Sequence, residues 1–366
     1  MKGINVNIRH SNSYSFCRFQ CLILLLVCSV FTINTHSQDA AQNAIKRSPE
    51  THNVNLSVEE LKNSNLKIGL ALSGGAAKGL AHIGAIKALE EAGIQIDYIA
   101  GSSMGALIGA AYASGIPIDT LEKIVTNTDL NFAKLFDPRL FQPGLIKGNK
   151  VKKFLYTLYG DKNIEDLPIP FAATATDIKT GKLYVINKGS LAEAVRASIS
   201  VPIVFTPLQY KEAFLVDGGV VNPVPIDVVR EMGAEHIIAV LVIFSDLLSD
   251  EKEFIEITDP DRERMKLSTT DNLSRKISEF LKISENKTED TIFVGDSEPP
   301  QITRMLENTV RIAQDAIAQL QIELYKPDLV IEPDVSNINL YEFNRAEDII
   351  EIGYREAIKV LKTLQK

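Results

Sequence analysis

Short apolar runs alternate with segments of helical periodicity along most of the chain after residue 66. In one such segment Ile83, Ile86 and Leu89 recur at the spacing of a single helix face. This alternation is typical of a mainly parallel central sheet that is sandwiched by helices, and we expect an α/β fold. The expected strands are 67–72, 96–100, 171–176, 183–186, 214–216, 237–244 and 329–331, and the longer helices are 80–92, 106–114, 302–325 and 345–364.

The first 37 residues have the composition of an export signal. Lys2, Arg9 and Arg18 give a basic start without acidic residues, and the uncharged run 21–35 follows. Its apolar centre is too short for a membrane-spanning helix, which needs about 20 apolar residues. We therefore expect a secretory signal that is cut near Gln38 and a periplasmic or envelope-associated protein. An uncleaved N-terminal anchor is the alternative.

The rest of the chain divides by composition into three parts. Residues 38–65 are polar and indicate a spacer, and residues 66–366 form the expected folded domain. Within that domain, residues 245–300 are charged and form an excursion. A helical stripe in the excursion either packs on the domain or contacts a membrane surface. The stripe consists of Leu273, Ile277, Phe280 and Leu281.

Cysteine positions and net charge exclude several classes of function. All three cysteines (Cys17, Cys21 and Cys28) lie in the leader, so the exported part has no disulfide, thiolate metal site or catalytic cysteine. Loss of the basic leader would take the net charge from −8 to −11. Such a surface argues against a nucleic-acid partner. We expect no metal and no cofactor, and the sequence gives no indication of the oligomeric state.

The segment Gly101-Ser102-Ser103-Met104-Gly105 joins an expected strand to an expected helix. A Gly-x-Ser-x-Gly at this place is typical of a nucleophile elbow, a sharp turn that exposes the central serine hydroxyl. Flanking glycines permit the turn, and the pattern makes Ser103 the candidate nucleophile. By itself the pattern also fits a helix that approaches a strand closely.

A serine nucleophile needs a base, and the chain offers few histidines for that role. Only His82 and His236 lie in the domain, and both positions fit structural roles better. Asp217, in Asp217-Gly218-Gly219, is therefore the best available partner of Ser103. A shielded aspartate that hydrogen-bonds the hydroxyl directly can act as the base.

The glycine-rich turn 73–79 offers consecutive backbone N–H groups at a helix N-terminus, which suits an oxyanion. Lys78, followed by Gly79, adds a cation that either steadies the loop or meets a phosphate. A nucleotide-binding module is the rival interpretation. Its spacing disagrees, because the turn lacks Gly-x-Gly-x-x-Gly and Lys78 is not followed by serine or threonine.

These motifs in this order resemble the patatin-like phospholipase family in its bacterial, exported form. The similarity spans about 67–241 and includes the segments 172–177, 194–202 and 222–225. The resemblance implies a three-layer fold related to the α/β-hydrolases, a Ser103–Asp217 dyad and acyl-ester lipid substrates. It further implies an oxyanion hole at Gly74, Gly75 and Ala76, with Lys78, Gly79, Gly101, Gly105, Gly218 and Gly219 in support. This chain has Ala76 where the family has a third glycine, and Lys78 where arginine is common.

The sequence thus predicts a serine esterase of the phospholipase or lysophospholipase type that forms an acyl-enzyme and contacts the membrane peripherally. A lipid acyltransferase and a non-catalytic lipid-binding envelope protein are the alternatives. Asp177 and Arg196 are expected to form an ion pair or a loop anchor. Four apolar residues either line an acyl groove or belong to the core. They are Phe132, Phe136, Leu140 and Phe141.

Overall fold

The computed structural model describes residues 57–63, 66–127, 148–242 and 302–364. The segment expected to be an export signal, the stripe in 245–300 and the apolar group 132–141 lie outside the described residues. The end of the expected spacer differs from the prediction. Residues Val58–Asn63 form helix α2, and Leu61 is buried in the main core.

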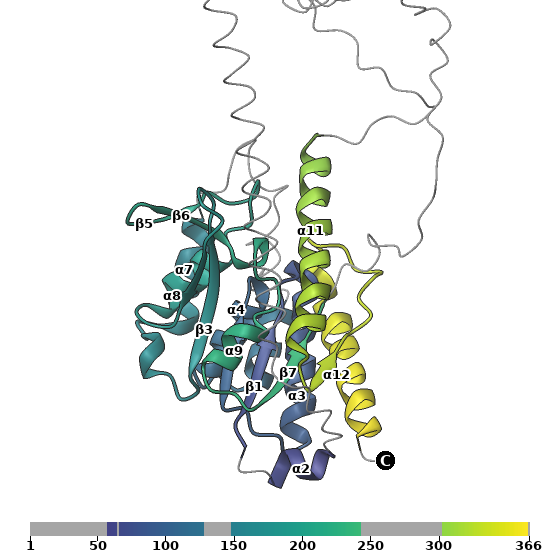
Figure 1. Cartoon of the computed structure of the whole chain (residues 1–366). Coiled ribbons are helices and arrows are strands. Elements are labelled where there is room, and N and C mark those ends of the chain that lie inside the picture. The colour runs from purple at the N-terminus through teal and green to yellow at the C-terminus, as the bar shows by residue number, and fades with distance from the viewer. Residues whose placement is uncertain (1–56, 64–65, 128–147, 243–301, 365–366) are drawn as a thin grey trace, which may run out of the picture.

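One mixed sheet forms the centre of the described part (Figure 1). Its strand order is β5-β6-β3-β2-β1-β7-β8, with β4 also paired to β3. β1, β2, β7 and β8 are mutually parallel, and β2 also runs parallel to β3, whereas β4, β5 and β6 form antiparallel pairs. The strands are β1 (Ile68–Leu72), β2 (Tyr98–Gly101), β3 (Phe171–Asp177), β4 (Leu183–Ile186), β5 (Leu208–Tyr210), β6 (Ala213–Asp217), β7 (His236–Val240) and β8 (Leu329–Ile331).

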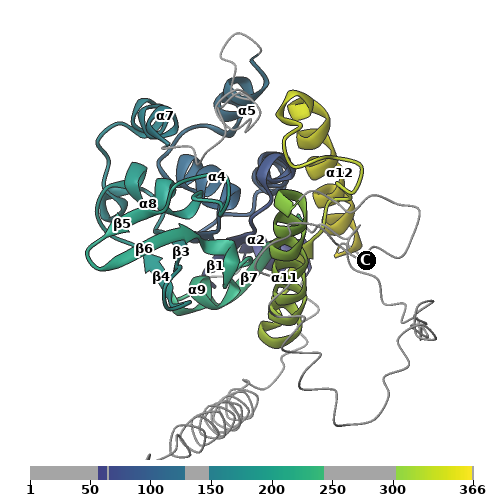
Figure 2. The ribbon, with the colours of Figure 1, turned by 90° about the horizontal axis from the view of Figure 1, so that it is seen from above.

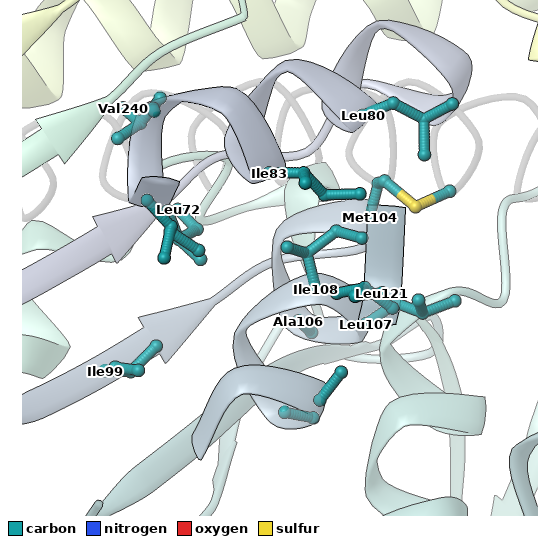
Figure 3. Close-up of a cluster of buried hydrophobic side chains, with 14 of the residues drawn as sticks. Leu72, Leu80, Ile83, Ile99, Met104, Ala106, Leu107, Ile108, Leu121 and Val240 are labelled. Atoms are coloured by element: carbon teal, nitrogen blue, oxygen red, sulfur yellow. The ribbon is translucent and has the colours of Figure 1, made fainter. Parts of the chain in front are cut away.

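Helices cover both faces of this sheet, as Figure 2 shows for α4 and α9 on opposite sides. Side chains alternate along a strand, so Leu70 and Leu72 of β1 enter one core and Ala71 enters the other. Figure 3 shows part of the larger core, where Leu72 lies near Ile83 and Ile108. The helices are α3 (Ala81–Glu91), α4 (Met104–Ala113), α5 (Ile118–Thr126), α7 (Asn149–Tyr159), α8 (Leu191–Ser198), α9 (Ile226–Glu231), α11 (Ile302–Tyr325) and α12 (Ala346–Thr363), with short 3-10 turns η1 (Ala76–Leu80), η4 (Ile164–Asp166), η5 (Gly218–Val220) and η7 (Phe343–Arg345).

The predicted fold class is confirmed: a mainly parallel sheet lies between two helical layers. The sequence did not predict β5, which has three residues and is largely exposed, so it carries no continuous apolar run. Within the parallel part of the sheet, β1, β2 and β7 end together, because Leu72 pairs with both Gly101 and Val240. The turns after β1 and β2 therefore start from the same edge of the sheet.

Candidate active site

Ser103 occupies the turn between β2 and α4 with a backbone that few residues adopt. Its φ is 51° and its ψ is −118°, although serine has a Cβ. Such strain is costly and persists only where the surroundings enforce it, as they do at many active sites. The flanking glycines allow the turn. A Cβ on Gly101 would lie 2.5 Å from the Ala106 nitrogen, and one on Gly105 would lie 2.3 Å from the Leu72 oxygen.

Asp217 ends β6 and reaches Ser103 directly. Ser103 and Asp217 line the same pocket, and the Gly219 N–H donates a hydrogen bond to Asp217 Oδ1 at 2.7 Å. Asp217 is 2 % exposed, and this burial raises its pKa to about 6, whereas hydrogen bonding from the Ser103 hydroxyl and the Gly219 N–H lowers it. The carboxylate is thus ionised at neutral pH and holds a pKa suited to accepting a proton.

A single segment after α8 holds both Ser103 and Asp217 in place. The Ser103 N–H donates to the Ser198 hydroxyl oxygen at 2.9 Å, and the Asp217 N–H donates to the Ser200 carbonyl at 3.0 Å. Arg196, 3 % exposed, donates to the Ser200 hydroxyl and to the Thr206 carbonyl. Sequence reasoning missed the two serines. The available signal was two serines in alternate positions within an otherwise apolar stretch.

Of the two roles expected for Asp177 and Arg196, an ion pair or a loop anchor, the structure shows the loop anchor. Asp177 instead anchors a loop, because its carboxylate accepts bonds from the Thr180 hydroxyl and from the N–H groups of Lys179 and Phe214. Arg196 instead donates its hydrogen bonds to Ser200 and Thr206. The alternative role, a loop anchor, describes both residues.

Neither described histidine lies beside Ser103. His236 starts β7 at the opposite edge of the sheet, where its Nδ1 lies 3.3 Å from the Asp328 carboxylate. His82 is fully buried, and its Nε2 lies 2.8 Å from the Ser73 carbonyl. Burial lowers the pKa of His82 to about 4, so its imidazole is neutral. Neither imidazole lines the pockets around Ser103.

The turn after β1 brings backbone N–H groups to Ser103, but not equally. The Gly74 N–H donates to the Pro223 carbonyl at 3.1 Å, which removes it from the expected donor set. Gly75 immediately precedes η1, and Ala76 is its first residue. The first N–H groups of a helix have no partner within that helix. A side chain on Gly75 would clash, since its Cβ would lie 2.4 Å from Val242 Cγ2.

Ala76 adopts a φ of 47°, the left-handed conformation that glycine tolerates best. The family's third glycine therefore corresponds to a real backbone requirement here, which the alanine meets at a cost of about 1–2 kcal/mol. Ala76 nevertheless lines the same pocket as Ser103.

The remaining supporting residues act on the scaffold. Lys78 is 1 % exposed and lines neither pocket at Ser103. The pKa of Asp334 is lowered mainly by hydrogen bonds from Ser336 and, to a smaller extent, by the charge of Lys78. Lys78 therefore fits the role of steadying the loop rather than meeting a phosphate. Gly79 lies against Met104, where a Cβ would come within 2.5 Å of its Cγ. Gly218 packs on Thr174 in the same way.

Two pockets meet at Ser103. The first, named here the α11 pocket, includes Asp217, Gly75 and the α11 residues Arg311, Gln314 and Asp315. The second, the apolar pocket, adds only apolar side chains to the residues that both pockets share. They are Met104, Ile199, Val204, Phe205 and Phe343. The shared residues are Ala76, Ser103, Val201, Leu340 and Tyr341. Gln314 had no signal in the sequence.

A strained serine between a parallel strand and a helix, in one pocket with a buried carboxylate, is the arrangement of α/β proteins with a nucleophile elbow. Comparison with known proteins supports this class. Residues 70–230 match the model of the patatin-like phospholipase family. An uncharacterized NTE family protein of Mycobacterium tuberculosis is 30% identical over 335 residues, which covers 82% of this chain and 93% of that protein. The chain therefore belongs to the patatin-like phospholipase family, whose members are lipid hydrolases.

Two animal relatives match a shorter region. Neuropathy target esterase sws of Drosophila melanogaster is 39% identical over 179 residues, 47% of this chain and 13% of that protein. Patatin-like phospholipase domain-containing protein 6 of Mus musculus is 36% identical over the same length. The similarity to these large proteins is thus confined to a small part of each.

Proposed function

We propose that this protein hydrolyses fatty-acyl ester lipids, of the phospholipid or lysophospholipid type, with Ser103 as the nucleophile and Asp217 as the base. The observation that carries the proposal is that Ser103 and the buried Asp217 carboxylate line one pocket, which neither described histidine lines. The family supports the class of reaction and lends weight to this substrate class.

The first half of the reaction makes an acyl-enzyme. Ser103 Oγ forms a bond to the ester carbonyl carbon while its proton passes to Asp217. The carbonyl oxygen becomes an oxyanion, which accepts hydrogen bonds from the N–H groups of Gly75 and Ala76. The carbon–oxygen bond to the alcohol then breaks, and the proton on Asp217 passes to the leaving oxygen.

The second half releases the fatty acid. A water molecule gives a proton to Asp217 and attacks the acyl-enzyme carbonyl through the same oxyanion geometry. The bond to Ser103 Oγ breaks, and the proton on Asp217 returns to that oxygen. The base thus serves twice and ends each turnover as a carboxylate.

Turnover of a chromogenic acyl ester tests this function directly. Purified full-length protein should hydrolyse p-nitrophenyl butyrate, and Ser103→Ala should abolish hydrolysis while the thermal unfolding curve stays cooperative. Undiminished turnover by Ser103→Ala would contradict the proposal. Fatty acid release from phospholipid, lysophospholipid and neutral-lipid vesicles would define the substrate, and transfer to an added alcohol would indicate an acyltransferase instead.

We also propose that the protein is exported and contacts a membrane surface to reach its lipid. The basic, then apolar, leader supports export, and the expected substrate class supports the membrane contact. Among the described helices none is long and apolar enough to cross a bilayer. N-terminal sequencing of protein from a fractionated cell tests export. A mature start near residue 38 in the envelope or periplasmic fraction agrees with it, and an intact Met1 in the cytosol would contradict it.

A further inference from the structure

Both pockets at Ser103 have mainly apolar linings, but only the α11 pocket adds charged side chains. The apolar pocket's five own residues are Met104, Ile199, Val204, Phe205 and Phe343, and each is at most 6 % exposed. None of these side chains carries a charge or a hydroxyl group. The α11 pocket, in contrast, holds both the base and the charged side chains Glu307, Arg311 and Asp315.

Ser103 lies where the two pockets join, together with Ala76. An ester whose carbonyl carbon meets Ser103 Oγ extends in two directions, one along the acyl chain and one along the alcohol. The alcohol oxygen must receive a proton from Asp217, and Asp217 lines only the α11 pocket. The acyl chain must then extend in the other direction, toward the apolar pocket.

We propose that the apolar pocket is the acyl-chain subsite and that the α11 pocket receives the alcohol part of the ester. This inference rests on the proposed function and assigns the substrate's orientation within that site. An alkyl chain suits the apolar pocket because burial of each methylene there contributes a favourable transfer free energy, and none of the five side chains that belong to this pocket alone is polar. A polar head group suits the other pocket, where charged groups are available to it.

Val204 and Phe343 are the positions best placed to set the acyl-chain length. They come from different elements, the segment after α8 and the 3-10 turn η7, and neither contacts Asp217 or the N–H donors as a hydrogen-bond partner. Val204→Phe should fill part of the pocket, and Phe343→Ala should enlarge it. Val185→Phe is the matched control, because Val185 is 40 % exposed on β4 and lines neither pocket.

The first experiment measures kcat/KM for p-nitrophenyl butyrate, octanoate and laurate. Val204→Phe should lower the laurate value relative to the butyrate value by about fourfold for each methylene that it excludes. Phe343→Ala should shift preference toward laurate, and Val185→Phe should keep the native ratio. Unchanged ratios in both pocket variants would overturn the proposal, whereas loss of butyrate turnover only in Ser103→Ala keeps the proposed function intact.

A second experiment needs no variant in the pocket. An alkyl fluorophosphonate with a diazirine at the chain end should phosphonylate Ser103 Oγ of the native protein, with loss of fluoride. Illumination should then crosslink the chain end to the peptide that holds Val204 and Phe205 or to the one that holds Phe343. Crosslinks to α11, or to any other peptide, would overturn the orientation. Failure to label Ser103 at all would count against the proposed function itself.

Discussion

The hydroxyl oxygen of Ser198 accepts a hydrogen bond of 2.9 Å from the backbone N–H of Ser103. Ser198 is fully buried at the end of α8, 95 residues further along the chain. This hydrogen bond holds the strained backbone of Ser103 by a residue outside its own turn. Two residues beyond Ser198, the Ser200 carbonyl accepts a hydrogen bond from the Asp217 N–H. The relative position of nucleophile and base is therefore set by one short segment rather than by the two motifs themselves.

Removal of the hydrogen bond between Ser103 and Ser198 should lower kcat more than it weakens substrate binding. Ser198→Ala leaves the Ser103 N–H buried without its acceptor, which costs about 1–3 kcal/mol. We expect kcat to fall at least about tenfold while KM changes little, because the turn shifts and substrate contacts remain. Steady-state kinetics with p-nitrophenyl butyrate measure both constants.

Ser114→Ala is the matched control for this variant. Ser114 is also a buried serine, and its hydroxyl donates to the Ala111 carbonyl at the far end of α4. It should lower the unfolding temperature by a similar amount but leave kcat unchanged. Equal kcat values for the two variants would contradict a positioning role for Ser198.

The pH dependence of the reaction should report the base. The free enzyme needs an ionised Asp217, whose pKa burial raises to about 6. We expect kcat/KM for a neutral ester to fall about tenfold per pH unit below pH 6 and to level off above pH 7. A pH profile between pH 4 and pH 8 measures this. An acid limb near pH 4 would contradict the burial effect, because that is the ordinary range of an aspartate.

Asp217→Asn should stabilise the protein while it abolishes turnover. The folded pKa lies above the ordinary value of 3.8, so ionisation of Asp217 favours the unfolded chain. Below about pH 4 the Asp217 carboxyl is protonated in both the folded and the unfolded chain, so its titration does not lower the free energy of unfolding there. Stability then declines as pH rises to about 6, above which the full penalty applies. The asparagine variant should therefore gain on the order of 2–3 kcal/mol at pH 8 and little at pH 4. Urea unfolding at both pH values measures the gain, and a loss at pH 8 would contradict it.

Ala76 and Gly75 should respond oppositely to substitution. Ala76→Gly relieves a left-handed alanine, so we expect a gain of up to about 1 kcal/mol in unfolding free energy with activity retained. Gly75→Ala should abolish activity, since its Cβ would lie 2.4 Å from Val242. Urea unfolding and ester turnover test the pair. Full activity of Gly75→Ala would contradict the assignment of this N–H to the oxyanion.

Neither described histidine should be needed for the chemistry. His82→Gln retains a donor for the Ser73 carbonyl, and His236→Gln changes a site at the opposite sheet edge. Loss of the histidine from a Ser–His–Asp triad lowers kcat by up to about 10⁶-fold. We expect both variants to stay near the native rate in the same ester assay. A triad-sized loss in either one would contradict a dyad without an imidazole.

The sequence predicted the fold well because its strands are apolar runs separated by glycine and proline. The strands before Ser103 and Asp217 were found for that reason, and so were α11 and α12 with their regular periodicity. The details of the site depend on contacts that no local pattern encodes. The Gly74 N–H donates to the carbonyl of Pro223, far along the chain, and Gln314 of α11, farther still, lines the pocket that holds Ser103 and Asp217. Local motifs thus pointed to the proposed nucleophile and base, but not to the residues that contact them.

The most direct test of the account is to isolate the acyl-enzyme. Native protein, mixed with p-nitrophenyl laurate and quenched in acid before turnover is complete, should carry one acyl group on the peptide that contains Ser103. The same treatment of Ser103→Ala and Asp217→Asn should give no adduct by mass spectrometry. An acyl group on another residue, or full ester turnover by Asp217→Asn, would contradict a mechanism in which this serine and this carboxylate act together.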